Sequence, residues 1–131
     1  MSQPKLVRDK IPDIIRSQGL EPVTRPAADG EFRRLLCAKL SEEVEEFLDS
    51  HDPDELADVL EVLLALAEDL GVGREGLEAR REQKAAERGA FTARLVWSGN
   101  KLSQANPEER RPHIDGKERI ELVDRDAVDR A

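Results

Sequence analysis

Several residue types that support stability or chemistry in small proteins are scarce in this sequence. Its 131 residues include one cysteine, two histidines and no tyrosine. The lone Cys37 excludes an internal disulfide and a cysteine-based zinc cluster, and we expect it to pack as a small hydrophobic residue among the leucines around it. Two histidines do not favour a histidine-based zinc site, so we expect His51 to play a structural part in a turn.

Long apolar segments and a positive net charge are also missing. The first residues, MSQPKLVRDK, contain no apolar signal-peptide core, and the longest apolar stretch, about residues 62–67, is too short to cross a bilayer. A net charge of -8 gives the chain no general attraction for nucleic-acid backbones or anionic membranes. We therefore expect a cytoplasmic protein that binds neither nucleic acid nor membrane, and an anionic substrate would need a bound metal or a basic stripe.

Apolar residues recur at helical spacing through the centre of the chain. A helix is expected over residues 30–48, and a second over 53–70, where Ser50 or Asp52 can cap the first turn and Pro53 suits it. The second helix is apolar around most of its circumference, so we expect it at the centre of a bundle or a dimer. A more polar helix is expected over about residues 74–88, and a short one entered near Pro12.

These elements predict an all-α fold, a helical bundle built around a helical hairpin that bears carboxylates and forms an oligomer. We expect one domain over residues 1–97, followed by a polar C-terminal tail or small hairpin over residues 98–131. Residues 115–123 carry the turn and strand-like signals for that hairpin. The beginning of the chain near residue 5 also resembles a strand, and residues 90–97 are strand-like or loosely packed.

Four acidic residues mirror one another across the expected turn. Glu43 and Glu46 are three residues apart, as are Glu55 and Asp58, so an antiparallel hairpin places Glu46 opposite Glu55 and Glu43 opposite Asp58. Helix geometry, with a rise of about 4.5 Å per three residues, makes these carboxylates converge on one small, partly buried patch.

The converging carboxylates repel one another, and no lysine or arginine occurs between Ser41 and Arg74 to neutralise them. Protonation or a hard divalent cation such as magnesium, which takes oxygen ligands and substrate phosphates, would relieve this repulsion. Glutamate also commonly solvates helix surfaces, and we assign that role to the neighbouring Glu42 and Glu45. For the four aligned positions, the mirror symmetry favours a metal.

Basic residues that could bind an anionic substrate lie elsewhere in the chain. Arg81, Lys84 and Arg88 share one face of the expected helix 74–88 and could contact phosphates. The alternative is a solvated face on which they pair with Glu78, Glu82 and Glu87. Arg8 and Lys10 are similar candidates near the N-terminus.

The carboxylate pattern resembles a known family motif. Residues 43–46 (EVEE) and 55–58 (ELAD) are similar to the Glu-x-x-Glu and Glu-x-x-Asp pairs of the all-α nucleoside triphosphate pyrophosphohydrolase superfamily, which includes the MazG proteins and phosphoribosyl-ATP pyrophosphohydrolase. Residues 6–12 (LVRDKIP) and 84–91 (KAAERGAF) resemble a MazG-like subgroup described as phosphoribosyl-ATP pyrophosphohydrolase-like. The resemblance covers about residues 5–96 and excludes the tail.

This resemblance implies a homodimer or higher oligomer that hydrolyses a nucleoside triphosphate between the α and β phosphates, with Mg2+ or alternatively Mn2+. The implied metal ligands are Glu43, Glu46, Glu55 and Asp58. Glu43 would also accept the proton of the attacking water, while Lys84 and Arg88 would stabilise the leaving pyrophosphate. Arg8, Lys10 and Arg81 would join Lys84 and Arg88 in binding the nucleotide.

Two departures from the family pattern leave the identity of the nucleotide substrate undetermined. The segment between the motifs, residues 47–54, is shorter than in many MazG proteins, and the lack of tyrosine leaves few aromatic residues to stack on a base: Phe32, Phe47, Phe91 and Trp97. Two other functions remain open as well. The chain could be a non-enzymatic acidic interaction module whose hairpin dimerises, or a nucleotide sensor without turnover.

Overall fold

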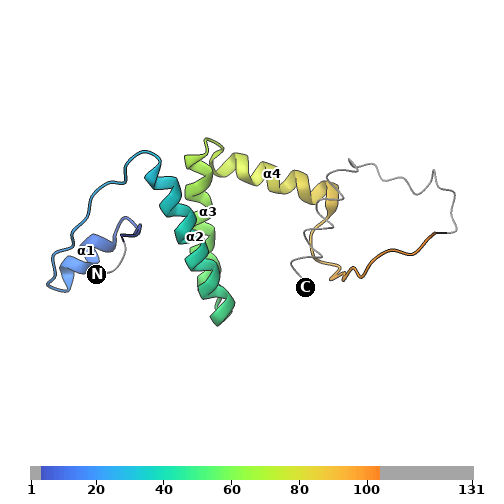
Figure 1. Cartoon of the computed structure of the whole chain (residues 1–131), viewed down its shortest axis with the longest axis horizontal. Helices are drawn as coiled ribbons and strands as arrows, with labels where there is room; N and C mark the ends of the chain where they lie inside the picture. Colours follow the sequence, from blue (N-terminus) through green and yellow to red (C-terminus); the bar gives the residue numbers. More distant parts are fainter. Residues whose placement is uncertain (1–3, 104–131) are drawn as a thin grey trace. The chain divides into compact units, whose positions relative to one another are not determined.

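Four α-helices occur in residues 4–103, the part of the chain that the structure, a computed structural model, describes. They are α1 (Ile11–Ser17), α2 (Glu31–Ser50), α3 (Pro53–Asp69) and α4 (Gly73–Arg88) (Figure 1). No strand occurs in that range. The predicted all-α class is therefore confirmed, and the strand-like interpretations near residue 5 and over residues 90–97 are wrong.

Helices α2 and α3 pack side by side as a hairpin with a very short turn (Figure 1). His51 ends α2 in a left-handed conformation with a φ of 56°, and its ring lies edge-on to Phe47 with 5.6 Å between centroids. The Asp52 carboxylate caps α3 by accepting a hydrogen bond from the Asp54 amide at 2.9 Å. The predicted structural role of His51 and the predicted Asp52 cap are both confirmed.

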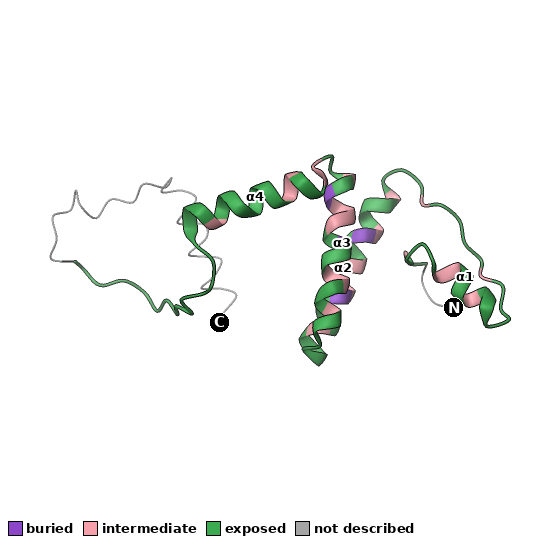
Figure 2. Cartoon of the chain, turned by 180° about the vertical axis from the view of Figure 1, so that it is seen from behind, coloured by how far each residue is buried: buried purple, intermediate pink, exposed green. Residues whose placement is uncertain are grey.

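The core of the single chain is small. The buried residues in the described range are Leu36, Glu43, Val62 and Ala67 (Figure 2). Helix α3 packs against α2 and α4, yet these neighbours leave Leu56, Leu60, Leu63 and Leu70 exposed by 36% to 57%. The expected burial of α3 is therefore not reached within one chain. Cys37 is also exposed, so its predicted packing role is wrong for the single chain.

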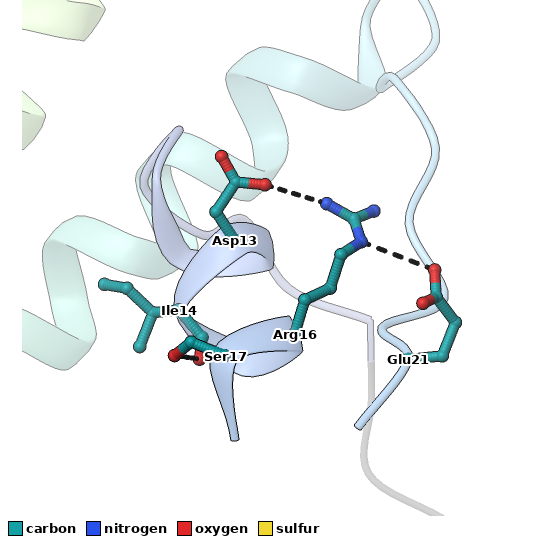
Figure 3. A network of polar contacts seen from close by, with 5 residues as sticks. All are labelled: Asp13, Ile14, Arg16, Ser17 and Glu21. Carbon is teal, nitrogen blue, oxygen red and sulfur yellow. Dashed lines mark hydrogen bonds and ion pairs between the residues drawn. The ribbon is translucent and has the colours of Figure 1, made fainter. Parts of the chain in front are cut away.

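Helix α1 is held mainly by contacts within its own neighbourhood. Arg16 donates to Asp13 at 2.9 Å and to Glu21 at 3.4 Å, and the Ser17 hydroxyl donates to the carbonyl of Ile14 at 2.6 Å (Figure 3). Within the described range, α1 packs against no other helix. The N-terminal segment is instead tied to the hairpin by residues 5–8, whose ion pairs belong to the candidate site.

Beyond α4 the chain divides into a second unit after Ala90. Residues 91–103 contain neither helix nor strand, and Phe91, Leu95 and Val96 are at least 85% exposed. These residues are loosely packed, which was the alternative to a strand over 90–97. The predicted hairpin over 115–123 lies outside the described residues, and the division into residues 1–97 and 98–131 stays a prediction.

None of the described helices combines the length and the apolar composition that a membrane span needs.

Candidate metal centre

Carboxylates of α2 and α3 gather in two groups that share Glu43. One oxygen each from Glu43, Glu55 and Asp58 lie within 4.8 Å of one another, and the same holds for Glu42, Glu43 and Glu46. Oxygens bound to one divalent cation at about 2.0–2.6 Å lie no more than about 5 Å apart. Each group therefore has the spacing that a single oxygen-ligated cation needs, and the first group joins the two helices.

Glu43 is the most unusual member of the cluster because it is charged and buried, with 7% of its surface exposed. Its Oε1 lies 3.3 Å from the ammonium of Lys39, whereas its buried Oε2 has no hydrogen-bond donor. A buried carboxylate oxygen without a donor or cation is destabilising. The donor set and this unpartnered oxygen both fit a hard cation at the carboxylates.

The pKa values in the cluster are shifted in the direction that crowding predicts. Burial raises the pKa of Glu43, the neighbouring Glu46 raises it further, and Lys39 opposes the shift. Burial also raises the pKa of Glu55, and the charge of Asp58 adds to it. Both carboxyl groups lie close to other carboxylates that repel their charge, and Glu43 is in addition buried from water. A proton or a cation would stabilise the cluster.

Two basic side chains already neutralise part of this charge. An Arg8 guanidinium nitrogen donates to Oδ1 of Asp58 at 2.6 Å, and Lys39 pairs with Glu43. The absence of lysine and arginine between Ser41 and Arg74 therefore does not leave the carboxylates without a neighbouring cation, because Arg8 and Lys39 come from outside that range. Lys39 could have been found from its position four residues before Glu43, a spacing that places both side chains on one helix face. Arg8 gives no such signal, because its pairing depends on tertiary structure.

The other glutamates of α2 differ in their surroundings. Glu42, assigned from sequence to a solvated face, is half-buried and belongs to the cluster, which corrects that assignment. Glu45 is exposed, as a solvated residue should be. Glu46 is exposed overall, but its carboxyl interacts with those of Glu43 and Glu55.

A cavity of about 400 Å³ lies beside the cluster, between the N-terminal segment, α2 and α3. Its charged lining residues are Arg8, Asp9, Lys39, Glu43, Asp58 and Glu61. Its apolar lining residues are Leu6, Val7, Phe32, Leu36, Val62 and Ala65. A mixed lining of this kind suits a small molecule that has both an apolar and a charged part.

The basic stripe of α4 does not line this cavity in the single chain. Arg81 donates from Nε to Glu78 at 2.9 Å, which is the surface pairing given above as the alternative to phosphate binding. Lys84 and Lys10 are exposed. The roles of these residues and of Arg88 in binding or stabilising a substrate stay predictions.

Comparison with known proteins gives no family assignment. No family model matches the chain, and no solved structure matches it. An uncharacterised protein of Mycolicibacterium smegmatis is 52% identical over 42 residues, which are 32% of this chain and 43% of that protein. The chain thus spans less than half the length of this curated relative. This relative is itself uncharacterised, so the similarity implies no activity.

Proposed function

We propose that the chain is a metal-dependent hydrolase that cleaves a nucleoside triphosphate between the α and β phosphates, as the resemblance to the all-α pyrophosphohydrolases implies. One observation carries the proposal: the buried Glu43, with an unpartnered oxygen, lies among carboxylates from two helices. A cavity large enough for a small molecule adjoins them. The all-oxygen donor set favours Mg2+, with Mn2+ as a substitute.

The residues of the cluster have distinct roles in this proposal. Glu43, Glu46, Glu55 and Asp58 would hold the metal, which when bound polarises phosphate oxygens and makes a water more acidic. Glu43 would also accept the proton of the attacking water, since a carboxylate beside a metal-bound water can act as its general base. The apolar lining of the cavity would exclude water from the rest of the substrate.

We also propose that two chains associate through α3. Leu56, Leu60 and Leu63 are exposed at the spacing of one helix face. A second copy packed on this face would complete a bundle with a larger apolar core. It could also bring a basic α4 stripe towards the carboxylates of its neighbour, because symmetric dimers share their surfaces reciprocally.

An interaction module without catalysis is the second candidate. The observation in its favour is the exposed apolar face of α3, together with an α4 stripe that does not line the cavity. The hydrolase and the interaction module both require a partner on the α3 face, so a measurement of association does not distinguish them. A measurement of nucleotide hydrolysis does distinguish them.

The deciding experiment measures pyrophosphate release from a panel of nucleoside triphosphates, with and without Mg2+. The wild type is compared with Glu46→Gln, and Glu45→Gln serves as a matched control because it makes the same change at an exposed position of α2. We expect Mg2+-dependent release that collapses in Glu46→Gln and persists in Glu45→Gln. Absence of release from the whole panel would favour the interaction module or the sensor.

A further inference from the structure

Two cations in the cavity beside the carboxylates are each paired with one candidate metal ligand. Lys39 lies 3.3 Å from Glu43, and Arg8 lies 2.6 Å from Asp58. All four side chains line the same cavity. The two cations come from different elements, α2 and the N-terminal segment, so their convergence is a property of the tertiary structure.

The environment of Lys39 is unusual for a lysine. Its side chain is 21% exposed, and besides Glu43 its ammonium has Glu42 at 3.8 Å. A lysine that gives up this much hydration needs an anionic partner. A divalent cation at the unpartnered Oε2 of Glu43 would lie close to the ammonium of Lys39 at Oε1 of the same carboxylate, so the two cations would repel each other.

Arg8 faces the same competition at Asp58. Arg8 lies before α1, in a segment that belongs to no helix and that also pairs with the hairpin through Lys5 and Glu42 at 3.6 Å. A change of partner by Arg8 therefore does not require a helix to move. A guanidinium can offer two parallel hydrogen bonds to a phosphate, and an ammonium acts on it as a point charge.

We propose that Lys39 and Arg8 form the anion subsite of the cavity and bind the phosphate chain of the nucleotide once a metal has taken Glu43 and Asp58. In the metal-free protein, the same two cations neutralise those carboxylates. This inference rests on the proposed function and deepens it, because it assigns Lys39 to substrate binding and links the two binding events.

The subsite predicts effects of opposite sign on two ligands. Lys39→Gln and Arg8→Gln each remove a competitor of the metal, so each should tighten Mn2+ binding by about threefold or more without nucleotide, as expected for one charge near the ion. Each should also weaken the binding of inorganic pyrophosphate to the Mn2+-loaded protein by about tenfold or more, as expected for a lost charge-assisted hydrogen bond. Isothermal titration calorimetry measures both.

Arg33→Gln is the matched control, because Arg33 is a basic residue of α2, as Lys39 is, and pairs with a carboxylate, that of Asp69 in α3, at 2.7 Å, but does not line the cavity. We expect its affinities for both ligands to stay within about twofold of wild type, since the screened charge lies outside the cavity. Lys39→Arg should recover most of the pyrophosphate affinity, because it restores the positive charge.

The outcomes separate this inference from the proposed function. If Lys39→Gln weakens Mn2+ and pyrophosphate binding together, Lys39 only supports the fold and the subsite is wrong. If wild type binds Mn2+ and hydrolyses nucleotides while both variants bind pyrophosphate as Arg33→Gln does, the subsite alone is wrong. If wild type binds no Mn2+, the proposed function fails and the subsite fails with it.

Discussion

Glu43 combines burial with charge, a combination that proteins tolerate where the charge has a partner. Lys39 partners one of its oxygens, and the other has none. The exposed Glu45, two residues further along the same helix, belongs to neither of the two carboxylate groups. Position on the helix face, and not residue type, therefore distinguishes a candidate ligand from a solvated glutamate.

Glu43→Gln should stabilise the metal-free protein at pH 7.5 and weaken its response to metal. Glutamine keeps the shape of the side chain while removing the charge that burial and Glu46 oppose. Because the folded-state pKa of Glu43 is raised, wild type gains stability relative to the variant as the pH falls through that pKa. The melting-temperature advantage of the variant should thus shrink towards pH 4.5.

Thermal melts of both proteins between pH 4.5 and 7.5, with and without Mn2+, check this prediction. Mn2+ should raise the melting temperature of wild type by several degrees and that of Glu43→Gln by much less, because binding to the folded state alone stabilises it. Glu45→Gln is the control and should behave as wild type does. Equal Mn2+ shifts in all three proteins would contradict a metal ligand at Glu43.

At the scale of the element, the α2–α3 hairpin shows what the sequence could and could not predict. The helix positions, the Asp52 cap and the grouping of Glu43 with Asp58 follow from local signals and from the register of an antiparallel pair. The partners of these carboxylates do not, because Arg8 reaches Asp58 from a segment fifty residues away. Sequence periodicity describes one helix at a time. A contact such as that between Arg8 and Asp58 depends on how separate segments pack together in the tertiary structure.

The Asp52 cap gives a stability prediction for α3. Asp52→Ala removes the acceptor of the Asp54 amide and should destabilise the protein by about 1 kcal/mol, the usual effect of losing an N-cap. Urea denaturation followed by circular dichroism measures the change. Asp49→Ala removes the same charge from an exposed position of α2 and should leave the stability nearly unchanged. An equal loss in both variants would point to charge and not to the cap.

The start of α2 gives a pH prediction of the opposite sign to that of Glu43. Glu31 accepts hydrogen bonds from Arg25 at 2.8 and 2.9 Å and from the Ala28 amide at 2.9 Å, and these lower its pKa to about 2. A lowered folded-state pKa contributes stability above the ordinary carboxyl pKa, and this contribution is lost as the pH falls towards 2.

Glu31→Gln should therefore lower the melting temperature by a few degrees at pH 7, and the difference from wild type should fade towards pH 2.5. Glu45→Gln, the same change at an exposed position of α2, should show no such difference at either pH. A difference between wild type and Glu31→Gln that stays constant with pH would mean that the carboxylate charge is not what stabilises this end of the helix.

At the scale of the whole molecule, burial in one chain falls short of what the apolar pattern of α3 predicts. The pattern predicts a helix covered on most sides. Among the described helices, α2 and α4 pack against it, and they leave Leu56, Leu60 and Leu63 exposed. Sequence periodicity indicates which apolar side chains are expected to be buried. It does not indicate whether they are buried by the same chain or by another molecule. The exposed leucines of α3 are therefore the reason for the proposal that a partner covers this face.

A second copy of the chain is the partner that we expect, and Leu60→Glu tests it. Leu60 is 53% exposed in the middle of the α3 face, so a buried charge there would oppose association without disturbing the single chain. Wild type should show twice the 14.7 kDa chain mass in light scattering after gel filtration, and Leu60→Glu should show the chain mass. Leu20→Glu, at a position 64% exposed outside the helices, should remain a dimer.

The same variant tests whether catalysis needs two chains. If Leu60→Glu becomes a folded monomer and loses pyrophosphate release, the catalytic site needs the second chain. A wild type that is monomeric and still releases pyrophosphate would show that one chain suffices.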